Sequence, residues 1–517
     1  MLSPEYLATF PDYIVELFEQ YDAFVVEDFA RRVAKAGKVT DTAEWQAIRA
    51  SEMGLSMDEL TSRSAELLEI TQTELQAMYQ EAFDSYIESD AKRFSGTGLN
   101  YDRIANNPVL RDYMTAAQEQ TQRSLQNIFG HSGAIKSMTG TTAVMLKVGN
   151  QYMPISKAYT MALDLAQMQV STGVLDYNTA IRNAIRSVAK QGVSTVIGDA
   201  VGYDSGYRLS VRAAARMCVL TGVNQMAGNM NKLVCDELEL DLVETTAHMG
   251  ARPSHQVWQG QIFSRSGRTD KYPDLVEATG LGTVSGLMGA NCRHNYYGYF
   301  EGSPRAYTDR QLYEMTDEGG PHIQYEGKEY TYYEATQKQR QLERQIISTK
   351  RELIGYDAAG DKEAFQEASI KLRGQKNRYM DFSKKANLLP QTERIQQDGY
   401  DRSLSGKATW AVRKASTPQL TNAAGRGIIA AQGSSHYGVP NSITQVVTKK
   451  GGISRDYFDN NGVWVKQITN NDHGFSTRHP YGNHGEHAHD ITWKGKKSFR
   501  TTRELTEDER KENADIL

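Results

Sequence analysis

Histidine is concentrated near the end of this chain. Five of its 11 histidines lie between His473 and His489, in a sequence of 517 residues. The imidazole titrates close to neutral pH, so it can take up and release protons during a reaction, and in its neutral form it is a common ligand for metal ions. The cluster therefore marks a candidate site for acid–base or metal chemistry.

Two chemical interpretations of this cluster compete with a structural one. If the segment is a strand, His487 and His489 lie on the same face. They could then act as a general acid and base in phosphodiester cleavage, because their pKa lies near the working pH. The alternatives are that the histidines bind a divalent metal or that they are surface side chains of a polar turn.

The acid–base interpretation assigns roles to neighbouring residues. Glu486 or Asp490 would assist the histidine pair, and Arg478 or Lys466 would hold the phosphate. The candidate catalytic set is His487, His489, Glu486, His473 and Arg478. Phage DNA or host RNA is expected as a nucleic-acid partner of the protein, and the sequence leaves the substrate of such a nuclease open.

A second group of ligand-type residues lies in the middle of the chain. His255, Cys292 and His294 offer nitrogen and sulfur donors suited to a tetrahedral Zn²⁺ ion, and His248 offers a fourth. A small, loop-rich domain has a thin core, so a metal ion would help to hold it together. No general base stands beside these residues, which favours a structural role for the metal. The alternative is that the polar residues around Cys292 form turn hydrogen bonds and the histidines are ordinary polar side chains.

Helices are expected to make up residues 1–235. A stripe of apolar residues recurs there at helical spacing, and it comprises Ile14, Leu17, Phe18 and Tyr21. Two capping-box patterns, Ser56 to Glu59 and Thr71 to Glu74, predict that helices begin at these points. Gly192 follows another apolar stripe and is predicted to end its helix.

The sequence changes character near residue 236. Residues 236–330 contain many glycines between short apolar runs, which predicts a small, loop-rich domain with strands. Residues 331–386 return to charged, amphipathic patterns. The segments Glu334–Leu353 and Glu363–Phe382, separated by Gly355–Asp361, predict an antiparallel helical hairpin.

The division continues to the end of the sequence. Residues 387–407 have little apolar content and are predicted to be a linker, residues 408–502 a small β-rich domain that carries the histidines, and residues 503–517 a charged tail. In the β-rich domain Ile443–Val447 is a predicted strand, and Asn461-Gly462 predicts the turn of a β-hairpin. The predicted fold class is therefore α+β.

Composition limits the classes of function. The length exceeds the roughly 250–300 residues at which single cores stop growing, so several domains are expected. A net charge of −4 argues against a protein that coats nucleic acid. Three cysteines, Cys218, Cys235 and Cys292, are too few for a disulfide framework and favour a reducing compartment. No apolar run reaches about 18 residues and the start lacks a secretory signal, so we expect no membrane span and synthesis in a cytoplasm.

An ordered series of motifs resembles the phage minor capsid protein 2 family over roughly residues 1–395. The motifs are Leu220-Thr221-Gly222-Val223-Asn224-Gln225, Thr246-Ala247-His248-Met249-Gly250-Ala251-Arg252-Pro253-Ser254-His255, Trp258-Gln259-Gly260, Asn291-Cys292-Arg293-His294, and the helical stretch Tyr333-Glu334-Ala335-Thr336-Gln337-Lys338-Gln339-Arg340 with Leu342-Glu343-Arg344. Each motif alone is weak, whereas the series is specific.

The resemblance extends to Mu-type head morphogenesis proteins, whose cores carry Cys-x-x-Cys followed later by Asn-Cys-Arg-Cys. This sequence departs from that pattern. His255 and His248 stand in for the first cysteines, and His294 replaces the last. The resemblance therefore implies a metal site whose ligands have been substituted.

The resemblance also implies a virion role. It implies a few copies in the phage head, synthesis in the host bacterial cytoplasm, and action in head morphogenesis or entry with the DNA. Residues 1–235 would contact the portal protein and the major capsid protein, and residues 236–330 would be the morphogenesis-like domain. Some head morphogenesis proteins carry variable C-terminal toxin domains, so the resemblance implies that the His-rich domain at 408–502 is an appended toxin-like domain, although no family signature marks it as a nuclease.

Overall fold

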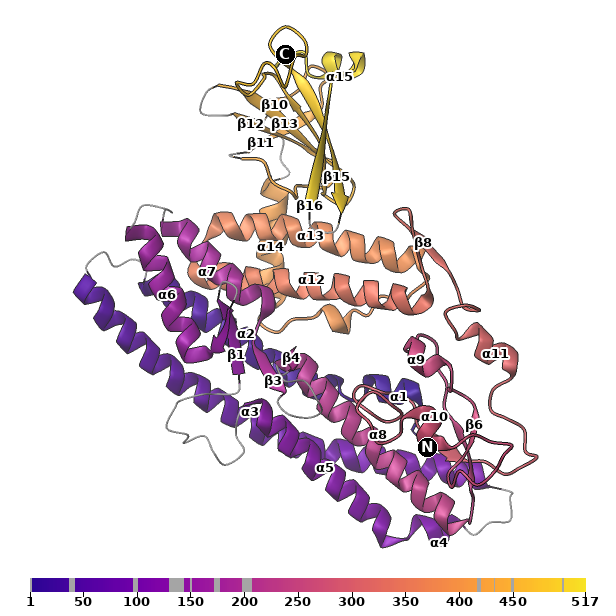
Figure 1. The fold of residues 1–517 in the computed structure, drawn as a ribbon. Coiled ribbons are helices and arrows are strands. Elements are labelled where there is room, and N and C mark those ends of the chain that lie inside the picture. Colours follow the sequence, from indigo (N-terminus) through magenta and orange to yellow (C-terminus); the bar gives the residue numbers. More distant parts are fainter. Residues whose placement is uncertain are drawn as a thin grey trace. The chain divides into compact units, whose positions relative to one another are not determined.

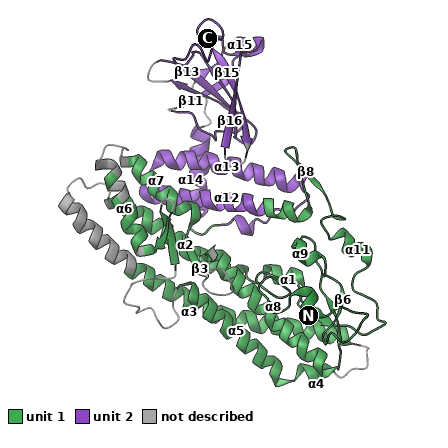
Figure 2. Ribbon diagram, viewed as in Figure 1, with its two compact units in different colours: residues 1–338, 397–399 green, residues 339–396, 400–517 purple. Residues whose placement is uncertain are grey.

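The chain divides into two units (Figure 2). The N-terminal unit comprises residues 1–338 with 397–399, and the C-terminal unit comprises residues 339–396 with 400–517. The structure is a computed structural model. It describes residues 2–36, 42–95, 101–129, 144–148, 151–171, 177–197, 207–415, 420–431, 433–447, 451–494 and 497–517. The elements confirm the predicted α+β class.

Long helices make up most of the first half of the N-terminal unit (Figure 1). They are α1 (Pro4–Thr9), α2 (Asp12–Ala36), α3 (Thr42–Phe94), α4 (Tyr101–Ala105), α5 (Pro108–Ile128), α6 (Ile155–Ser171), α7 (Tyr177–Gln191) and α8 (Val211–Glu237). The predicted stripe of α2, from Ile14 to Tyr21, is buried, and α8 packs against both α2 and α5. Gly192 ends α7 with a φ of 66°, as predicted.

Helix α3 contradicts the predicted helix starts. It runs without a break through both capping-box patterns, Ser56–Glu59 and Thr71–Glu74. A capping box requires an extended cap residue, whereas both segments have helical backbone. Serine and threonine are tolerated inside helices, and the apolar stripe of Leu75, Tyr79 and Phe83 continues past the second pattern and is buried.

The helical region also contains a sheet that the periodicity did not predict. Its strands, in the antiparallel order β2-β1-β3-β4, are β1 (Val144–Val148), β2 (Gln151–Pro154), β3 (Ser194–Ile197) and β4 (Tyr207–Ser210). Strand β1 packs on α6 and α7. Strands of four or five residues carry too little pattern to be recognised beside long helices.

Residues 236–330 form a loop-rich region around a small antiparallel sheet of order β6-β5-β7. The elements are β5 (Leu242–Thr245), α9 (Pro253–Gln256), β6 (Ile262–Ser264), α10 (Leu275–Thr279), β7 (Tyr296–Gly298), α11 (Asp309–Glu314) and the hairpin of β8 (Ile323–Tyr325) and β9 (Lys328–Tyr330). Its core is Cys235, Val243, Trp258, Phe263, Leu275, Leu287 and Tyr296. Because Cys235 belongs to α8, the long helix is part of this core.

The C-terminal unit joins a helical hairpin to a seven-stranded sheet. Its helices are α12 (Tyr332–Ala359), which begins in the other unit, α13 (Lys362–Lys385), the 3-10 turn η1 (Glu393–Ile395), α14 (Arg402–Ala415) and α15 (Glu507–Glu512). Its strands are β10 (Leu420–Thr421), β11 (Gly427–Ala431), β12 (Ile443–Val447), β13 (Ile453–Phe458), β14 (Trp464–Thr469), β15 (His487–Lys494) and β16 (Lys497–Arg503), in sequential order across the sheet.

Three boundaries in this unit differ from the sequence-based expectation. Helix α12 continues through most of the predicted turn and ends only before Gly360, whose φ of 72° favours glycine. Helix α14 begins inside the predicted linker, where the Asp401 side chain accepts the Leu404 N–H at 2.8 Å. The predicted tail is not a separate extension, because Leu505 belongs to the sheet core and Leu517 packs against it.

The seven-stranded sheet has two different faces. One face contributes Ile443, Tyr457, Ile468 and Ala488 to an apolar core that also contains Leu505. The opposite face carries a polar row across paired strands, formed by Thr444, Asp456, Gln467, His489 and Thr502. The predicted Asn461-Gly462 turn joins β13 to β14, and Gly462 has a φ of 71°.

Candidate metal centre

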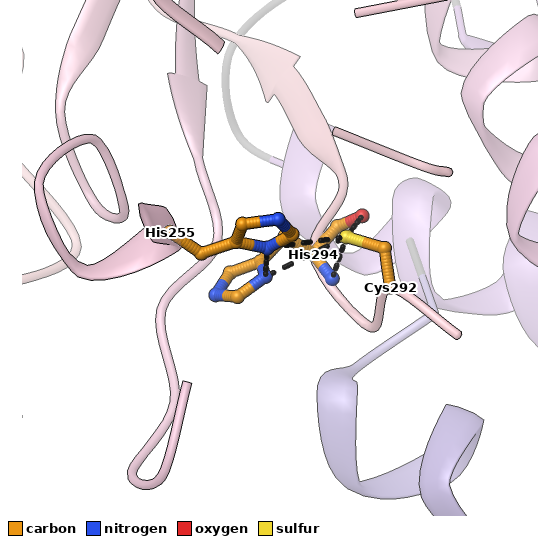
Figure 3. A group of neighbouring side chains, drawn as sticks. All are labelled: His255, Cys292 and His294. Atoms are coloured by element: carbon orange, nitrogen blue, oxygen red, sulfur yellow. Dashed lines mark hydrogen bonds between the residues drawn. The ribbon is translucent and has the colours of Figure 1, made fainter. Parts of the chain in front are cut away.

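Two loop segments bring the central ligand-type residues together. His255 lies on α9, a short helix that starts at Pro253, where the missing N–H needs no partner. Cys292 and His294 lie in the loop just before β7. Met288 and Asn291 have φ values of 57° and reverse this loop. Figure 3 shows the three side chains pointing toward one another.

The spacing of the three donor atoms matches a metal site. The Nδ1 atoms of His255 and His294 are 3.4 Å apart, and Cys292 Sγ lies 3.8 Å from the first and 3.6 Å from the second. With Zn–N near 2.0–2.1 Å and Zn–S near 2.3 Å, a tetrahedral ion needs about 3.3–3.4 Å between nitrogens and about 3.6 Å between nitrogen and sulfur. The observed triangle therefore has nearly the size that one Zn²⁺ requires.

Hydrogen bonds on the outer nitrogens orient both rings. His255 Nε2 lies 2.8 Å from the carbonyl oxygen of Ser285, and His294 Nε2 lies 3.1 Å from Oε1 of Gln259. The same Gln259 oxygen accepts the His248 N–H at 3.1 Å, so it must be an acceptor. Both Nε2 atoms therefore donate, which leaves the Nδ1 lone pairs facing Cys292. This is the outer-shell arrangement typical of metal-binding histidines.

Helix α8 holds the loop that carries two of the three residues. Asn224 Nδ2 donates to the carbonyl oxygens of Cys292 at 3.0 Å and His294 at 2.9 Å. The Asn224 side-chain oxygen accepts from Asn295 at 2.8 Å. Asn224 is fully buried, so these bonds fix the loop from the long helix.

His248 lies beside the group and is not one of the three converging residues. Its ring stacks on His294 with centroids 4.4 Å apart. Its Nδ1 contacts the Met249 carbonyl oxygen at 2.9 Å and Arg293 at 3.1 Å. The structure therefore brings together three of the four predicted ligands.

Burial keeps the three residues neutral when no ion is bound. It lowers the pKa of His255 and holds the pKa of His294 well below its usual range. It also raises the pKa of the Cys292 thiol. A divalent cation would reverse the state of the thiol, because a coordinated thiol is deprotonated.

The C-terminal histidines form a second cluster. His473, His487 and His489 each place a ring nitrogen within 4.8 Å of the others. His479, which the predicted catalytic set omits, stacks on His487 with centroids 4.1 Å apart. His479 lies in the same His-rich segment of the sequence, and this location alone could have indicated that it belongs to the cluster.

The other predicted catalytic side chains are engaged elsewhere. Glu486 accepts the N–H groups of Asn483 and His484 and pairs with Arg510. These bonds hold its pKa at about 2, although burial acts in the opposite direction. Arg478 is exposed and lies over the Phe475 ring.

Lys466 and Asp490 are directly paired across β14 and β15 but face away from His489. Lys466 binds Glu509, and Asp490 binds Arg503. The sequence did not identify Arg500 of β16, whose charge adds to burial and to the charge of neighbouring histidines in lowering the pKa of His473 and His489. Its signal is register alone, since position 500 shares a strand face with Thr502.

Comparison with known proteins places most of the chain in one family. Residues 2–384 match the family described as phage minor capsid protein 2. The chain belongs to this family. The chain is also 25% identical, over 154 residues, to a "Structural protein" of Lactococcus phage LL-H. That alignment covers 29% of this chain and 40% of the other, so the chain aligns with less than half of that relative.

The family match divides the two clusters. Residues 2–384 include the His255–Cys292–His294 centre and end one residue before the end of α13. The C-terminal sheet with its histidines lies outside the match. No solved structure matches the chain. None of the described helices combines the length and apolar character needed to cross a bilayer.

Proposed function

We propose that this minor capsid protein is a structural component of the phage head near the portal, and that it acts in head morphogenesis or enters the host with the DNA. The family match over residues 2–384 carries the proposal. The proposed partners are the portal protein and the major capsid protein, contacted by the long helices of residues 1–235. Synthesis would take place in the host bacterial cytoplasm.

Within this role the central region would hold a structural Zn²⁺ ion. Support comes from the donor triangle of His255, Cys292 and His294 and from the hydrogen bonds that orient its rings. The ion would join α9 to the loop before β7 in a region with a small apolar core. His248 or a water molecule would complete four-fold coordination.

A stop codon early in the gene for this protein tests the head role. The proposal expects infected cells to yield defective or empty heads, with normal particles restored when the full chain is supplied from a plasmid. Complementation by a Cys292→Ala/His294→Ala variant should be weaker than by a matched His322→Ala variant, which changes a histidine outside both clusters. Normal, infectious particles without the protein would contradict the proposal.

A second candidate function belongs to the C-terminal domain, as a nuclease of ribonuclease type delivered with the phage genome. The observation that favours it is the histidine cluster on the polar sheet face, outside the family match. Its substrate would be host RNA. Purified full-length protein should degrade RNA, and His487→Ala should abolish the cleavage while His322→Ala preserves it. Equal stability of RNA with and without the protein would exclude this candidate.

A further inference from the structure

We propose that the C-terminal histidine cluster binds one divalent transition-metal ion, with Zn²⁺ as the natural candidate. The ligands are His473, His487 and His489, and His479 lies beside them. This site and the central centre share no residue. They also differ in their donors, because the central centre includes the sulfur of Cys292 whereas all the ligands here are imidazole nitrogens. The inference rests on the geometry of the cluster and does not depend on nuclease activity or on the virion role.

The three imidazoles are close enough to share one ion. The Nε2 atoms of His487 and His489 are 3.0 Å apart, and the donor atoms of all three lie within 4.8 Å of one another. Two nitrogens on a tetrahedral Zn²⁺ are separated by about 3.3–3.4 Å. Small rotations of the side chains would bring the third nitrogen to the same distance.

The same spacing is too short for an acid and a base that flank a phosphate. In phosphodiester cleavage the acid and the base each form one hydrogen bond, about 2.8 Å long, to the leaving or the attacking oxygen of the phosphate. These two oxygens lie on opposite sides of the phosphorus, about 3.5 Å apart, so the two histidine nitrogens would be separated by roughly 6–9 Å. The cluster, with donor atoms within 4.8 Å, leaves no room for a phosphate between its members. An ion fits where the phosphate does not, so a nuclease built on these histidines would use the metal.

Outer hydrogen bonds orient two of the rings toward the ion. His487 Nδ1 lies 2.7 Å from the carbonyl oxygen of Gly485, so it donates and leaves the Nε2 lone pair facing the cluster. His489 Nδ1 lies 3.0 Å from the Thr502 hydroxyl. A carbonyl or hydroxyl on the far nitrogen is the arrangement that fixes metal-binding histidines.

The loop that carries His473 is held in place by close packing. Gly485 has a φ of 80°, and a Cβ there would lie 2.4 Å from the Cβ of Asp472. His473 itself has a φ of 55°, in the left-handed region that only a few per cent of non-glycine residues adopt. The backbone of the His473 loop therefore packs closely against the segment just before β15. His473 is exposed, so water can reach the proposed ion.

A hydrogen bond between His487 and His489 is the simplest alternative, and it explains only two of the four rings. It leaves unexplained the approach of His473, whose ring lies 5.2 Å from His487 between centroids. It also does not explain why the buried Nδ1 atom of His479 has no hydrogen-bond partner. An ion at the centre gives the grouping of His473, His487 and His489 a common cause.

Cobalt binding by the full-length, chelator-treated protein tests the proposal. Co²⁺ bound to a thiolate has a near-ultraviolet charge-transfer band that an all-nitrogen site lacks, so the two sites are distinguishable in one titration. We expect visible absorption from a site that persists in Cys292→Ala and that is weakened at least tenfold in His473→Asn. Asparagine tolerates the left-handed conformation, so His473→Asn removes the ligand and preserves the loop.

Two further variants guard against effects on folding. Thr502→Val keeps the size of the side chain but removes the partner of His489 Nδ1, and it should weaken cobalt binding by about 10- to 100-fold. His322→Ala, a histidine paired with Glu329 outside both clusters, should leave binding unchanged. The proposal is overturned if Cys292→Ala binds no cobalt, or if its binding is the same with and without His473→Asn.

Discussion

Replacing Asn224 with alanine should open the loop that carries Cys292 and His294. The Asn224 amide donates to the carbonyl oxygens of both residues, at 3.0 and 2.9 Å, in a fully buried position. Each buried carbonyl left without a donor costs about 1–3 kcal/mol. The two carbonyls together lower the free energy of opening this loop by roughly 2–6 kcal/mol.

Hydrogen exchange measured by mass spectrometry reads this loss directly. Each 1.4 kcal/mol is about a tenfold change in an equilibrium constant, so amides in peptides covering residues 288–298 should exchange at least about 30-fold faster in Asn224→Ala. Asn229→Ala is the matched control, because Asn229 is an exposed asparagine on the same helix. Equal exchange in the two variants would refute the conclusion that α8 holds the ligand loop.

Three further predictions concern other parts of the chain. Saturating Zn²⁺ at about 1,000 times its dissociation constant should stabilise the wild-type N-terminal unit by about 4 kcal/mol, measured by calorimetry, and an equal effect in Cys292→Ala would exclude the central site. Arg503 and Lys466 hold the pKa of Glu509 well below its usual range. Because this folded-state pKa is depressed, the stability that Glu509 contributes is present at neutral pH and falls as the pH drops below about 4. Glu509→Gln should therefore reduce the loss of stability of the C-terminal unit at acid pH, measured by unfolding as a function of pH. The same loss of stability in the variant and the wild type would contradict the assignment. Gly485→Ala should destabilise the same domain by at least about 1–3 kcal/mol in chemical denaturation, whereas exposed Gly406→Ala, which has open space around it, should not.

Local sequence patterns predicted the elements whose residues share one periodicity. The stripe from Ile14 to Tyr21 gave α2, and the Asn461-Gly462 turn gave the β13–β14 hairpin. The same reasoning misplaced the helix starts in α3, because a capping-box sequence is compatible with a helix interior. Tertiary packing determines where these helices begin, and the pattern of a single sequence does not reveal that packing.

The candidate sites were predicted as sets of residue types, and the fold selected among their members. The pattern identified His255, Cys292 and His294, which converge although up to 39 residues separate them. It could not exclude His248, whose Nδ1 contacts Arg293. Near the C-terminus it could not tell that Glu486 would bind backbone N–H groups.

Strand register is the other feature that the sequence did not predict. Arg500 and Thr502 belong to β16 and reach the cluster only because His489 is paired with Thr502. Strand β16 itself, Lys497–Arg503, contains no histidine to draw attention to it. Register across a sheet depends on contacts distant in the chain, so the composition of one segment does not give it.

Cryo-electron microscopy of the mature phage particle tests the proposed head role most directly. The account predicts density at the portal vertex that fits the helices α2, α3, α5 and α8 of this chain, in a few copies and in contact with the portal protein. Particles that lack the polypeptide, or that carry it evenly over the whole shell, would contradict the account.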